Sequence, residues 1–379
     1  MGLVADVFSD TRLKKLPGNL AIGHNRYSTT GMSKIKNAQP CLIEYAGGTM
    51  ALGHNGNLVN ATEIRKELGA SGAIFQSTND SEVIVHLMAL SKCNSFVDRA
   101  VAALSQVKGA YSIVLMSENE LIAARDPQGF RPLCLGKLDG AYIVASESCV
   151  MDLVEAEFIR ELEPGEVILI NQDGVKSFFP FPKAPIKQCV FEHVYFSRPD
   201  SFLFGKSVYS VRKLMGHVLA KEKPVDADVI VPVPDSGVIS AMGYSEESKI
   251  PFQMGLIRNH YVGRTFIEPQ SQIRNFGVKI KLNAVKHIIK GKRVIIIDDS
   301  IVRGTTSKKI VKMLRDVGAK EVHVRVSSPP TMHSCFYGID TPNPGELIAS
   351  NMDVEQTRKY LGADSLYYIT LEKMLEIFG

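Results

Sequence analysis

The sequence lacks long hydrophobic runs, a secretion signal and closely spaced cysteines. No apolar stretch approaches the roughly 20 residues of a transmembrane helix. The N-terminal residues Met1–Asp6 lack the charged start and sustained apolar region of a signal peptide. The six cysteines are scattered, without a Cys-x-x-Cys pair, which argues against a disulfide framework. These absences predict a protein of the reducing cytoplasm with no membrane partner.

A strong charge excess is also missing. The 44 Lys and Arg residues nearly balance the 40 Asp and Glu residues, and the net charge of +4 is too mild to indicate a nucleic-acid partner. Local basic clusters around a polyphosphate ligand account for it equally well. With 45% hydrophobic and 22% charged residues, the composition is that of an ordinary globular protein. A chain of 379 residues is expected to form more than one domain.

The most informative stretch is 293–307. An apolar, β-branched run, Val294–Ile297, is too short for a helix and predicts a buried parallel strand. It ends in two carboxylates, Asp298 and Asp299, and ligands in open α/β sheets bind just past the carboxyl ends of strands. One loop later, Gly304–Ser307 places three hydroxyls at a helix start, which suits a phosphate monoester.

Two interpretations of this stretch compete. Adjacent carboxylates suit the hydroxyls of a ribose or a hydrated Mg²⁺. The plainer alternative is a strand followed by two solvated acids and an ordinary N-cap Thr. The hydroxyl-rich turn at this spacing favours the phosphate-binding interpretation.

The pattern of elements changes along the chain. Residues 1–170 contain mostly short strands, with a few helices, which predicts stacked antiparallel sheets flanked by helices. Residues 171–190 are predicted to be a connecting segment. From about 191, strands and helices alternate, which predicts a parallel, doubly wound α/β sheet. We therefore expect two domains, 1–180 and 181–379.

Three polar turns are expected in the first domain, two of them directly after short apolar strands. They are Arg26–Thr29, after a predicted strand at Leu20–His24; His54–Asn57; and Thr78–Glu82. Each has a plain interpretation on its own: a surface Arg, a hairpin turn at Asn-Gly, and a helix capping box with Asp80 or Ser81 as the cap.

Taken in order, the three turns resemble the glutaminase domain of the N-terminal-nucleophile amidotransferases, an α+β fold. The resemblance implies that Arg26 binds the α-carboxylate of glutamine and Asp80 its ammonium group. It also implies an oxyanion hole made by the Asn55 side chain and the Gly56 backbone N–H. The chemistry agrees, because a tetrahedral intermediate needs two donors aimed at one oxyanion, glycine permits close approach, and Arg binds carboxylates in a bidentate way.

The nucleophile of that family is a Cys at the mature N-terminus. The segment Met1–Phe8 resembles an internal piece of the family instead, so the catalytic Cys is expected outside this chain. Cys41 follows Gln39-Pro40 and is neither N-terminal nor beside a base, so we expect it to pack against its neighbours.

Two further stretches of the second domain carry phosphate-binding features. Val231–Gly237 ends a strand in a tight turn before a helix, and successive N–H groups in such a turn form an anion nest. The alternative is a plain Pro-rich loop. The stretch 258–274 is basic, aromatic and polar, and is either a solvated loop or a loop that closes over pyrophosphate with Arg258, Tyr261 and Arg264.

The stretch 293–307 resembles the phosphoribosyl pyrophosphate (PRPP) signature of type I phosphoribosyltransferases. The resemblance implies contacts of the acids Asp298 and Asp299 with the ribose hydroxyls and Mg²⁺. It implies that the 5′-phosphate is bound by Arg303, Gly304, Thr305 and Thr306. It also implies that the pyrophosphate is bound by Asp235, Ser236 and Gly237, and that Ser236 contacts Mg²⁺ as well.

Over essentially its whole length the chain resembles the amidophosphoribosyltransferase (glutamine PRPP amidotransferase) family. Tyr195–Ser201 matches it strongly, and the contexts of Cys189 and Cys335 resemble its iron–sulfur subclass. The resemblance implies that these two thiols ligate a [4Fe–4S] cluster, which needs four thiolates. The other two are expected in a Cys-x-x-Cys beyond Gly379, so we expect both domains to lack a terminal part of the family.

The family is a class of glycosyltransferases (pentosyltransferases). Its reaction makes 5-phosphoribosylamine, glutamate and pyrophosphate from PRPP, glutamine and water, the first step of de novo purine (IMP) synthesis. Members are homo-oligomers inhibited by purine nucleotides. Because the nucleophile is expected elsewhere, we predict no activity with glutamine, whereas synthesis with ammonia depends on whether the second domain folds. Two alternatives stay open. One is a non-catalytic PRPP or nucleotide-binding regulator on the same fold. The other is a different glutamine-fed transferase, such as a sugar-phosphate aminotransferase, but the motif at 298–307 argues against it.

Overall fold

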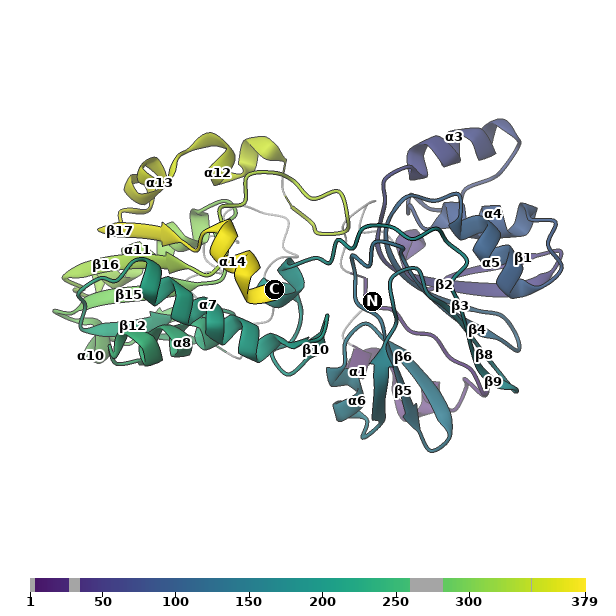
Figure 1. The fold of residues 1–379 in the computed structure, drawn as a ribbon, viewed down its shortest axis with the longest axis horizontal. Helices are drawn as coiled ribbons and strands as arrows, with labels where there is room; N and C mark the ends of the chain where they lie inside the picture. The colour runs from purple at the N-terminus through teal and green to yellow at the C-terminus, as the bar shows by residue number, and fades with distance from the viewer. Residues whose placement is uncertain (1–3, 27–34, 260–281, 342) are drawn as a thin grey trace. The chain divides into compact units, whose positions relative to one another are not determined.

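The computed structural model of the protein describes four stretches of the chain: 4–26, 35–259, 282–341 and 343–379 (Figure 1). These residues form two compact units. The first comprises Met1–Cys189 and Cys335–Asp340, and the second comprises Val190–Ser334 and Thr341–Gly379. No helix among the described residues is long and apolar enough to cross a membrane.

The first unit is built on a six-stranded antiparallel sheet with the order β1-β2-β3-β4-β8-β9. Its strands are β1 (Cys41–Tyr45), β2 (Gly48–Leu58), β3 (Gly109–Met116), β4 (Leu121–Arg125), β8 (Val167–Asn171) and β9 (Gly174–Phe178). A second, three-stranded sheet has the order β6-β5-β7. Its strands are β5 (Cys134–Leu138), β6 (Ala141–Ala145) and β7 (Glu157–Glu161). The helices of the unit are α1 (Val4–Val7), α2 (Asp10–Leu13), α3 (Ala61–Ala70), α4 (Glu82–Leu90), α5 (Phe96–Leu104) and α6 (Cys149–Leu153).

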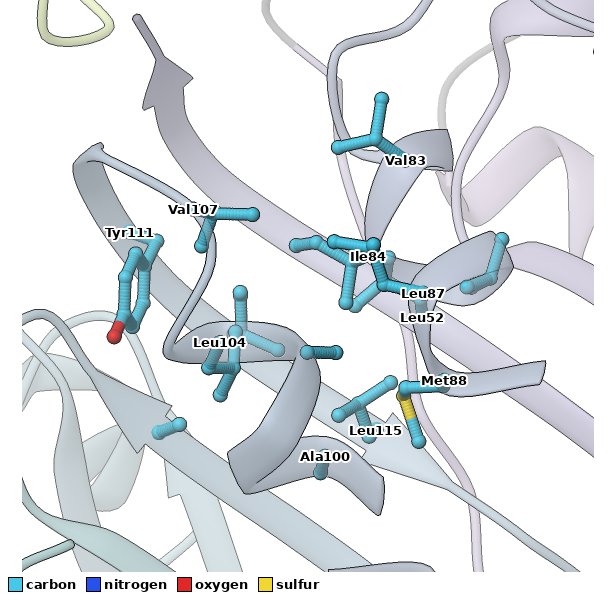
Figure 2. Close-up of a cluster of buried hydrophobic side chains, with 14 of the residues drawn as sticks. Leu52, Val83, Ile84, Leu87, Met88, Ala100, Leu104, Val107, Tyr111 and Leu115 are labelled. Carbon is cyan, nitrogen blue, oxygen red and sulfur yellow. The ribbon is translucent and has the colours of Figure 1, made fainter. Parts of the chain in front are cut away.

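The six-stranded sheet is covered on both faces. Successive residues of a strand point to opposite faces. On β4, Ile122 and Ala124 join the core formed with α3, α4 and α5, whereas Ala123 joins a separate core with residues of β5 and β8. Figure 2 shows Ile84 and Met88 of α4 among the side chains of the first of these cores. Each such buried side chain contributes roughly 1.5–3 kcal/mol, so these two cores fix the position of β2, which carries the predicted oxyanion residues.

The second unit contains a four-stranded parallel sheet with the order β12-β15-β16-β17. Its strands are β12 (Val229–Pro232), β15 (Arg293–Asp298), β16 (Glu321–Val326) and β17 (Ser365–Tyr368). Two short antiparallel pairs accompany it: β10 (Phe202–Leu203) with β11 (Lys206–Ser207), and β13 (Leu256–Arg258) with β14 (Leu282–Ala284). The α-helices are α7 (Val208–Glu222), α8 (Val238–Ser248), α10 (Lys286–Ile289), α11 (Thr305–Asp316), α12 (Ile348–Asn351), α13 (Val354–Leu361) and α14 (Leu371–Phe378).

This parallel sheet is also covered on both faces. On β15, Val294 and Ile296 pack in one core with residues of α11, whereas Ile295 and Ile297 pack in another with residues of α7 and α8. Helices α7 and α8 lie over one face of the sheet in Figure 1. A strand buried on both faces explains why β15 is apolar at four successive positions.

The predicted fold class is confirmed: an α+β unit with stacked antiparallel sheets precedes a doubly wound α/β unit. Several local predictions are wrong. Leu20–His24 forms no strand, and the expected connecting segment 171–190 contains β9. The expected turn at Asn55-Gly56 does not exist, because β2 continues through both residues to Leu58. The segment Cys335–Asp340 packs within the first unit.

Candidate active sites

The two adjacent acids lie at the carboxyl end of β15. Asp298 is the last residue of this strand. Asp298 and Asp299 are buried, with relative solvent exposures of only 8% and 6%. The backbone N–H of Asp299 donates to Asp298 Oδ1 at 3.0 Å. The Asp299 carboxylate accepts hydrogen bonds from the hydroxyls of Ser300 and Ser236. The plain interpretation of two solvated acids is therefore wrong.

Burial raises the pKa of both carboxyl groups. For Asp298, desolvation is the larger cause and the charge of Asp299 adds to it. For Asp299, desolvation again dominates, against hydrogen bonds from Ser236 and Ser300 and the charge of Arg212. Such a pair is costly to ionise unless a cation or hydrogen-bond donors approach it. This environment suits a bound Mg²⁺ or the hydroxyls of a ribose.

The turn Asp235–Gly237 lies at the same edge of the sheet. It connects β12 to α8, and β12 pairs with β15 in parallel, with Pro232 opposite Ile297. A Cβ on Gly237 would lie 2.3 Å from the carbonyl oxygen of Ile297, so only glycine lets the turn approach β15 this closely. The hydrogen bond between Ser236 and Asp299 then joins the turn to the acidic pair.

A third feature is the N-terminus of α11, after the acidic pair. Its N-cap is Gly304, with φ of +72°, and no side chain caps the first turn. The plain prediction of an N-cap Thr is therefore wrong, and Thr305 and Thr306 are exposed in the first turn. Uncapped N–H groups, the helix dipole and two hydroxyls make an anion site. Arg303 lies beside this turn and donates from Nε to Glu346 Oε2 at 2.9 Å.

The residues predicted for the closing loop are only partly described. Arg258 ends β13 and donates from Nη1 to Asp235 Oδ2 at 2.5 Å, so it meets the predicted pyrophosphate turn. Tyr261 and Arg264 lie outside the described residues.

The predicted oxyanion residues lie within β2 of the first unit. Asn55 and Gly56 are half-buried and pair with Ser112 and Tyr111 of β3. Gly56 has φ of +148°, and a Cβ there would lie 2.0 Å from the carbonyl oxygen of Ala110. The position therefore requires glycine.

Asp80 lies close to this part of β2. Its Oδ2 accepts the N–H of Leu58 at 2.8 Å, and its Oδ1 accepts the hydroxyl of Ser81 at 3.2 Å. Ser81 Oγ also lies 2.8 Å from Nδ1 of buried His54. Ser81 precedes α4 but makes no capping hydrogen bond, so the capping-box alternative is wrong.

A cavity of about 250 Å³ opens beside Asp80. Its lining includes Asn57, Thr62, Asn79 and Phe336. Asn57 and Asn79 belong to the polar turns that the sequence singled out, whereas Thr62 and Phe336 were missed, because nothing in their local pattern marks them. The volume is ample for an amino acid, and the lining offers amide, hydroxyl and carboxylate groups for its polar ends.

Arg26 and Cys41 belong to the same neighbourhood. Burial raises the pKa of the Cys41 thiol, a hydrogen bond with Asn79 lowers it, and the charges of Asp80 and Arg26 also act on it. Arg26 is half-buried. The structure thus brings Arg26 and Asp80 within electrostatic reach of one thiol, which burial keeps in its neutral form.

Cys189 contacts Phe130 in the first unit, and Cys335 is linked to the same residue through Tyr337. The N–H of Cys189 donates to the carbonyl oxygen of Phe130 at 3.1 Å. The N–H of Tyr337 donates to Cys335 Sγ at 3.2 Å, and the Tyr337 ring stacks on Phe130 with centroids 4.2 Å apart. Within the described part of the chain, no group of three or more His, Cys, Asp or Glu side chains is arranged to hold a metal.

Comparisons with known proteins match both units. A family described as "Glutamine amidotransferase domain" matches residues 24–152, and one described as "Phosphoribosyl transferase domain" matches residues 205–328. Together with the two folds, these matches define the class: a glutamine amidotransferase domain joined to a phosphoribosyltransferase domain.

Relatives that span the whole chain narrow this class. Amidophosphoribosyltransferase 2, chloroplastic, from Arabidopsis thaliana is 52% identical over 380 residues, covering 100% of this chain and 68% of its own length. The amidophosphoribosyltransferase of Bacillus subtilis is 49% identical over 379 residues, covering 100% of this chain and 80% of its own. The solved B. subtilis glutamine PRPP amidotransferase complexed with ADP and GMP superposes with a TM-score of 0.93, at 48% identity, over 100% of this chain and 82% of that one. The chain belongs to the amidophosphoribosyltransferase family, whose members are PRPP-dependent glycosyltransferases.

Proposed function

We propose that the second unit binds PRPP and transfers its phosphoribosyl group to ammonia, which forms 5-phosphoribosylamine and pyrophosphate in the first step of purine synthesis. The observation that carries this proposal is the buried pair Asp298–Asp299, joined through Ser236 to the turn before α8. The turn Asp235–Gly237 and the α11 N-terminus flank the pair with two separate anion-binding features. PRPP carries phosphate groups at two ends of a ribose and fits this order.

Each set of residues has a distinct role in this scheme. Asp298 and Asp299 accept hydrogen bonds from the ribose hydroxyls and so fix the anomeric carbon. The exposed Thr305 and Thr306 hydroxyls and the first N–H groups of α11 hold the 5′-phosphate. The N–H groups of the turn Asp235–Gly237 hold the pyrophosphate.

The acidic pair also fits a magnesium ion. Its oxygen donors are of the type Mg²⁺ prefers, and burial raises the pKa of both carboxyl groups, an effect that a bound cation would offset. Asp298, Asp299 and Ser236 would hold the ion. Mg²⁺, when bound, offsets the charge that develops on departing pyrophosphate.

In the first unit, we propose a glutamine site between Arg26 and Asp80, with Asn55 and Gly56 as oxyanion donors. Arg26 suits the α-carboxylate and Asp80 the ammonium group. Cys41 lies near both charges, but burial raises the pKa of its thiol, so it is a poor nucleophile. Burial likewise raises the pKa of the Cys134 thiol, to about 12. We therefore propose that these 379 residues use ammonia as the amine donor.

Cys189 and Cys335 both belong to the first unit, and thiolates are the ligands that iron–sulfur clusters use. We propose them as ligands of a [4Fe–4S] cluster, which would cross-link the segment after Ser334 to the first unit. We further propose a cytoplasmic homo-oligomer inhibited by purine nucleotides. The B. subtilis relative complexed with ADP and GMP supports the nucleotide part of this proposal.

The donor preference is tested by pyrophosphate release. Purified protein is mixed with PRPP and Mg²⁺, and either ammonium chloride or L-glutamine is added. We expect turnover with ammonium and none with glutamine. Turnover with glutamine refutes the donor assignment. PRPP binding without turnover under either donor favours the alternative of a non-catalytic PRPP-binding regulator.

A further inference from the structure

A short segment far along the chain contacts β2 at the predicted oxyanion residue Gly56 and at its neighbour Asn57. Cys335–Asp340 packs within the first unit, and the Asn57 amide donates from Nδ2 to the carbonyl oxygen of Phe336 at 2.9 Å across 279 residues of sequence. Asn57 follows Gly56 directly on β2. The site and this distant segment are thus joined by a hydrogen bond one residue from the predicted oxyanion donor.

The closest approach is between two glycines. Gly338 has φ of +102°, and a Cβ on it would lie 2.8 Å from the carbonyl carbon, 2.9 Å from Cα and 3.0 Å from the carbonyl oxygen of Gly56. A Cβ on Gly56 would in turn lie 2.0 Å from the carbonyl oxygen of Ala110. Gly56 therefore lies close to the backbone of β3 and to the backbone of the distant segment.

The residues between these contacts hold the segment in place. The Tyr337 ring stacks on Phe130 at 4.2 Å between centroids and 15° between planes, and Phe130 is buried. Phe336 lines the cavity beside Asp80. Three successive residues thus make three different contacts: Phe336 with the cavity and Asn57, Tyr337 with Phe130, and Gly338 with Gly56.

We infer that Phe336–Gly338 is a positioning segment for the glutamine site, which holds the Gly56 peptide in the orientation that an oxyanion requires. This inference rests on the proposed glutamine site of the first unit. Donors in an oxyanion hole act only when they are aimed in advance. Gly56 has a φ of +148° that glycine adopts readily, and the contact with Gly338 adds to the restriction that pairing with β3 already imposes.

A matched pair of glycine substitutions tests the inference. Gly338→Ala adds a methyl group against Gly56. Gly174→Ala is the control, since Gly174 has a nearly identical φ of +107° but no atom within 4 Å of the added Cβ. Both variants carry the same backbone strain, so a difference between them reports the contact with Gly56.

Two readouts are compared. In ¹⁵N-glycine-labelled protein, we expect the Gly56 amide signal to move in Gly338→Ala and to stay in place in Gly174→Ala. Oxyanion donors bind the ground-state amide of glutamine less strongly than the oxyanion, so in calorimetric titration we expect the Kd for L-glutamine to rise by at most about tenfold in Gly338→Ala, with no change in the control. An unmoved Gly56 signal overturns the inference. Absence of glutamine binding by the unsubstituted protein contradicts the proposed glutamine site instead, so the two failures appear in different signals.

A second pair avoids glycine altogether. Tyr337→Phe keeps the ring on Phe130, whereas Tyr337→Ala removes it. We expect Tyr337→Ala to shift the Gly56 amide and weaken glutamine binding, and Tyr337→Phe to restore both. Ammonium-driven pyrophosphate release is measured in parallel to check that the second unit is intact. Equal Gly56 signals in the two Tyr337 variants contradict a positioning role for this segment.

Discussion

Gly237→Ala is the substitution whose effect on the second unit follows most directly from the geometry. The added Cβ would lie 2.3 Å from the carbonyl oxygen of Ile297 and 3.1 Å from that of Val233. Both oxygens belong to the backbone, so neither moves away as a flexible side chain would. The backbone φ at Gly237 is −78°, which any residue adopts, so the substitution adds a steric clash without backbone strain.

The size of the effect follows from the contact distance. Ordinary contacts begin near 3.4 Å, so the turn must retreat from β15 by about 1 Å. A displacement of about 1 Å in a positioning group costs on the order of 100-fold in rate. Because Ser236 is the adjacent residue, the same displacement weakens its hydrogen bond to Asp299. We therefore expect kcat/KM for PRPP to fall about 100-fold.

The assay is initial-rate pyrophosphate release with ammonium as donor. Gly345→Ala is the control, since no atom lies within 4 Å of its added Cβ, and we expect it to leave the rate unchanged. Glutamine binding by the first unit shows that Gly237→Ala has not unfolded the whole protein. If the rate of Gly237→Ala stays within about twofold of the control, the loss is far smaller than a displacement of about 1 Å predicts. That result would refute the assignment of this turn to pyrophosphate.

Three further predictions address the charged groups. Burial raises the pKa of Asp298 in the folded protein, so the native state binds more protons and stability falls as pH rises above the unfolded pKa of about 4. Thermal unfolding of Asp298→Asn at pH 5 and pH 8 should therefore show a shallower pH slope and a gain in stability at pH 8, and an unchanged slope contradicts this. Cys41→Ser should leave the ammonium-driven rate and glutamine binding unchanged; loss of a glutamine-driven rate in this variant would make Cys41 the nucleophile. Glu82→Gln should cost about 1–3 kcal/mol in chemical denaturation, because the carboxylate accepts from the N–H of Gln76 and from both the N–H and the hydroxyl of Ser77, and a loss below this range contradicts that role.

The second unit is the part most predictable from sequence, because its signals are local. Val294–Ile297 is apolar at every position since both faces of the sheet are covered, and Asp298 follows where the strand reaches its edge. The helix predicted after Gly237 is α8, which begins at Val238, and the helix start predicted at Gly304–Ser307 is the N-terminus of α11. The turn residues and acids therefore fall where their local pattern places them.

The first unit is less predictable, because distant pairing overrides local preference there. Asn55-Gly56 is a strong turn signal, yet pairing with β3 carries the strand through it. Gly174–Phe178 has an exposed face and begins with a Gly, so its sequence did not predict the edge strand β9. The contacts of Phe336 and Gly338 with β2 join residues nearly the full chain apart, and no periodicity in a single sequence encodes them.

The central claim is that the acidic pair at the end of β15 forms the PRPP site of this chain. Calorimetric titration of PRPP in the presence of Mg²⁺ tests it most directly, with the unsubstituted protein compared to the double variant Asp298→Asn, Asp299→Asn. Because Asn keeps the shape of Asp but lacks its charge, we predict binding by the unsubstituted protein and its loss, by at least about 100-fold, in the double variant. Equal affinities of the two proteins for PRPP would contradict the claim.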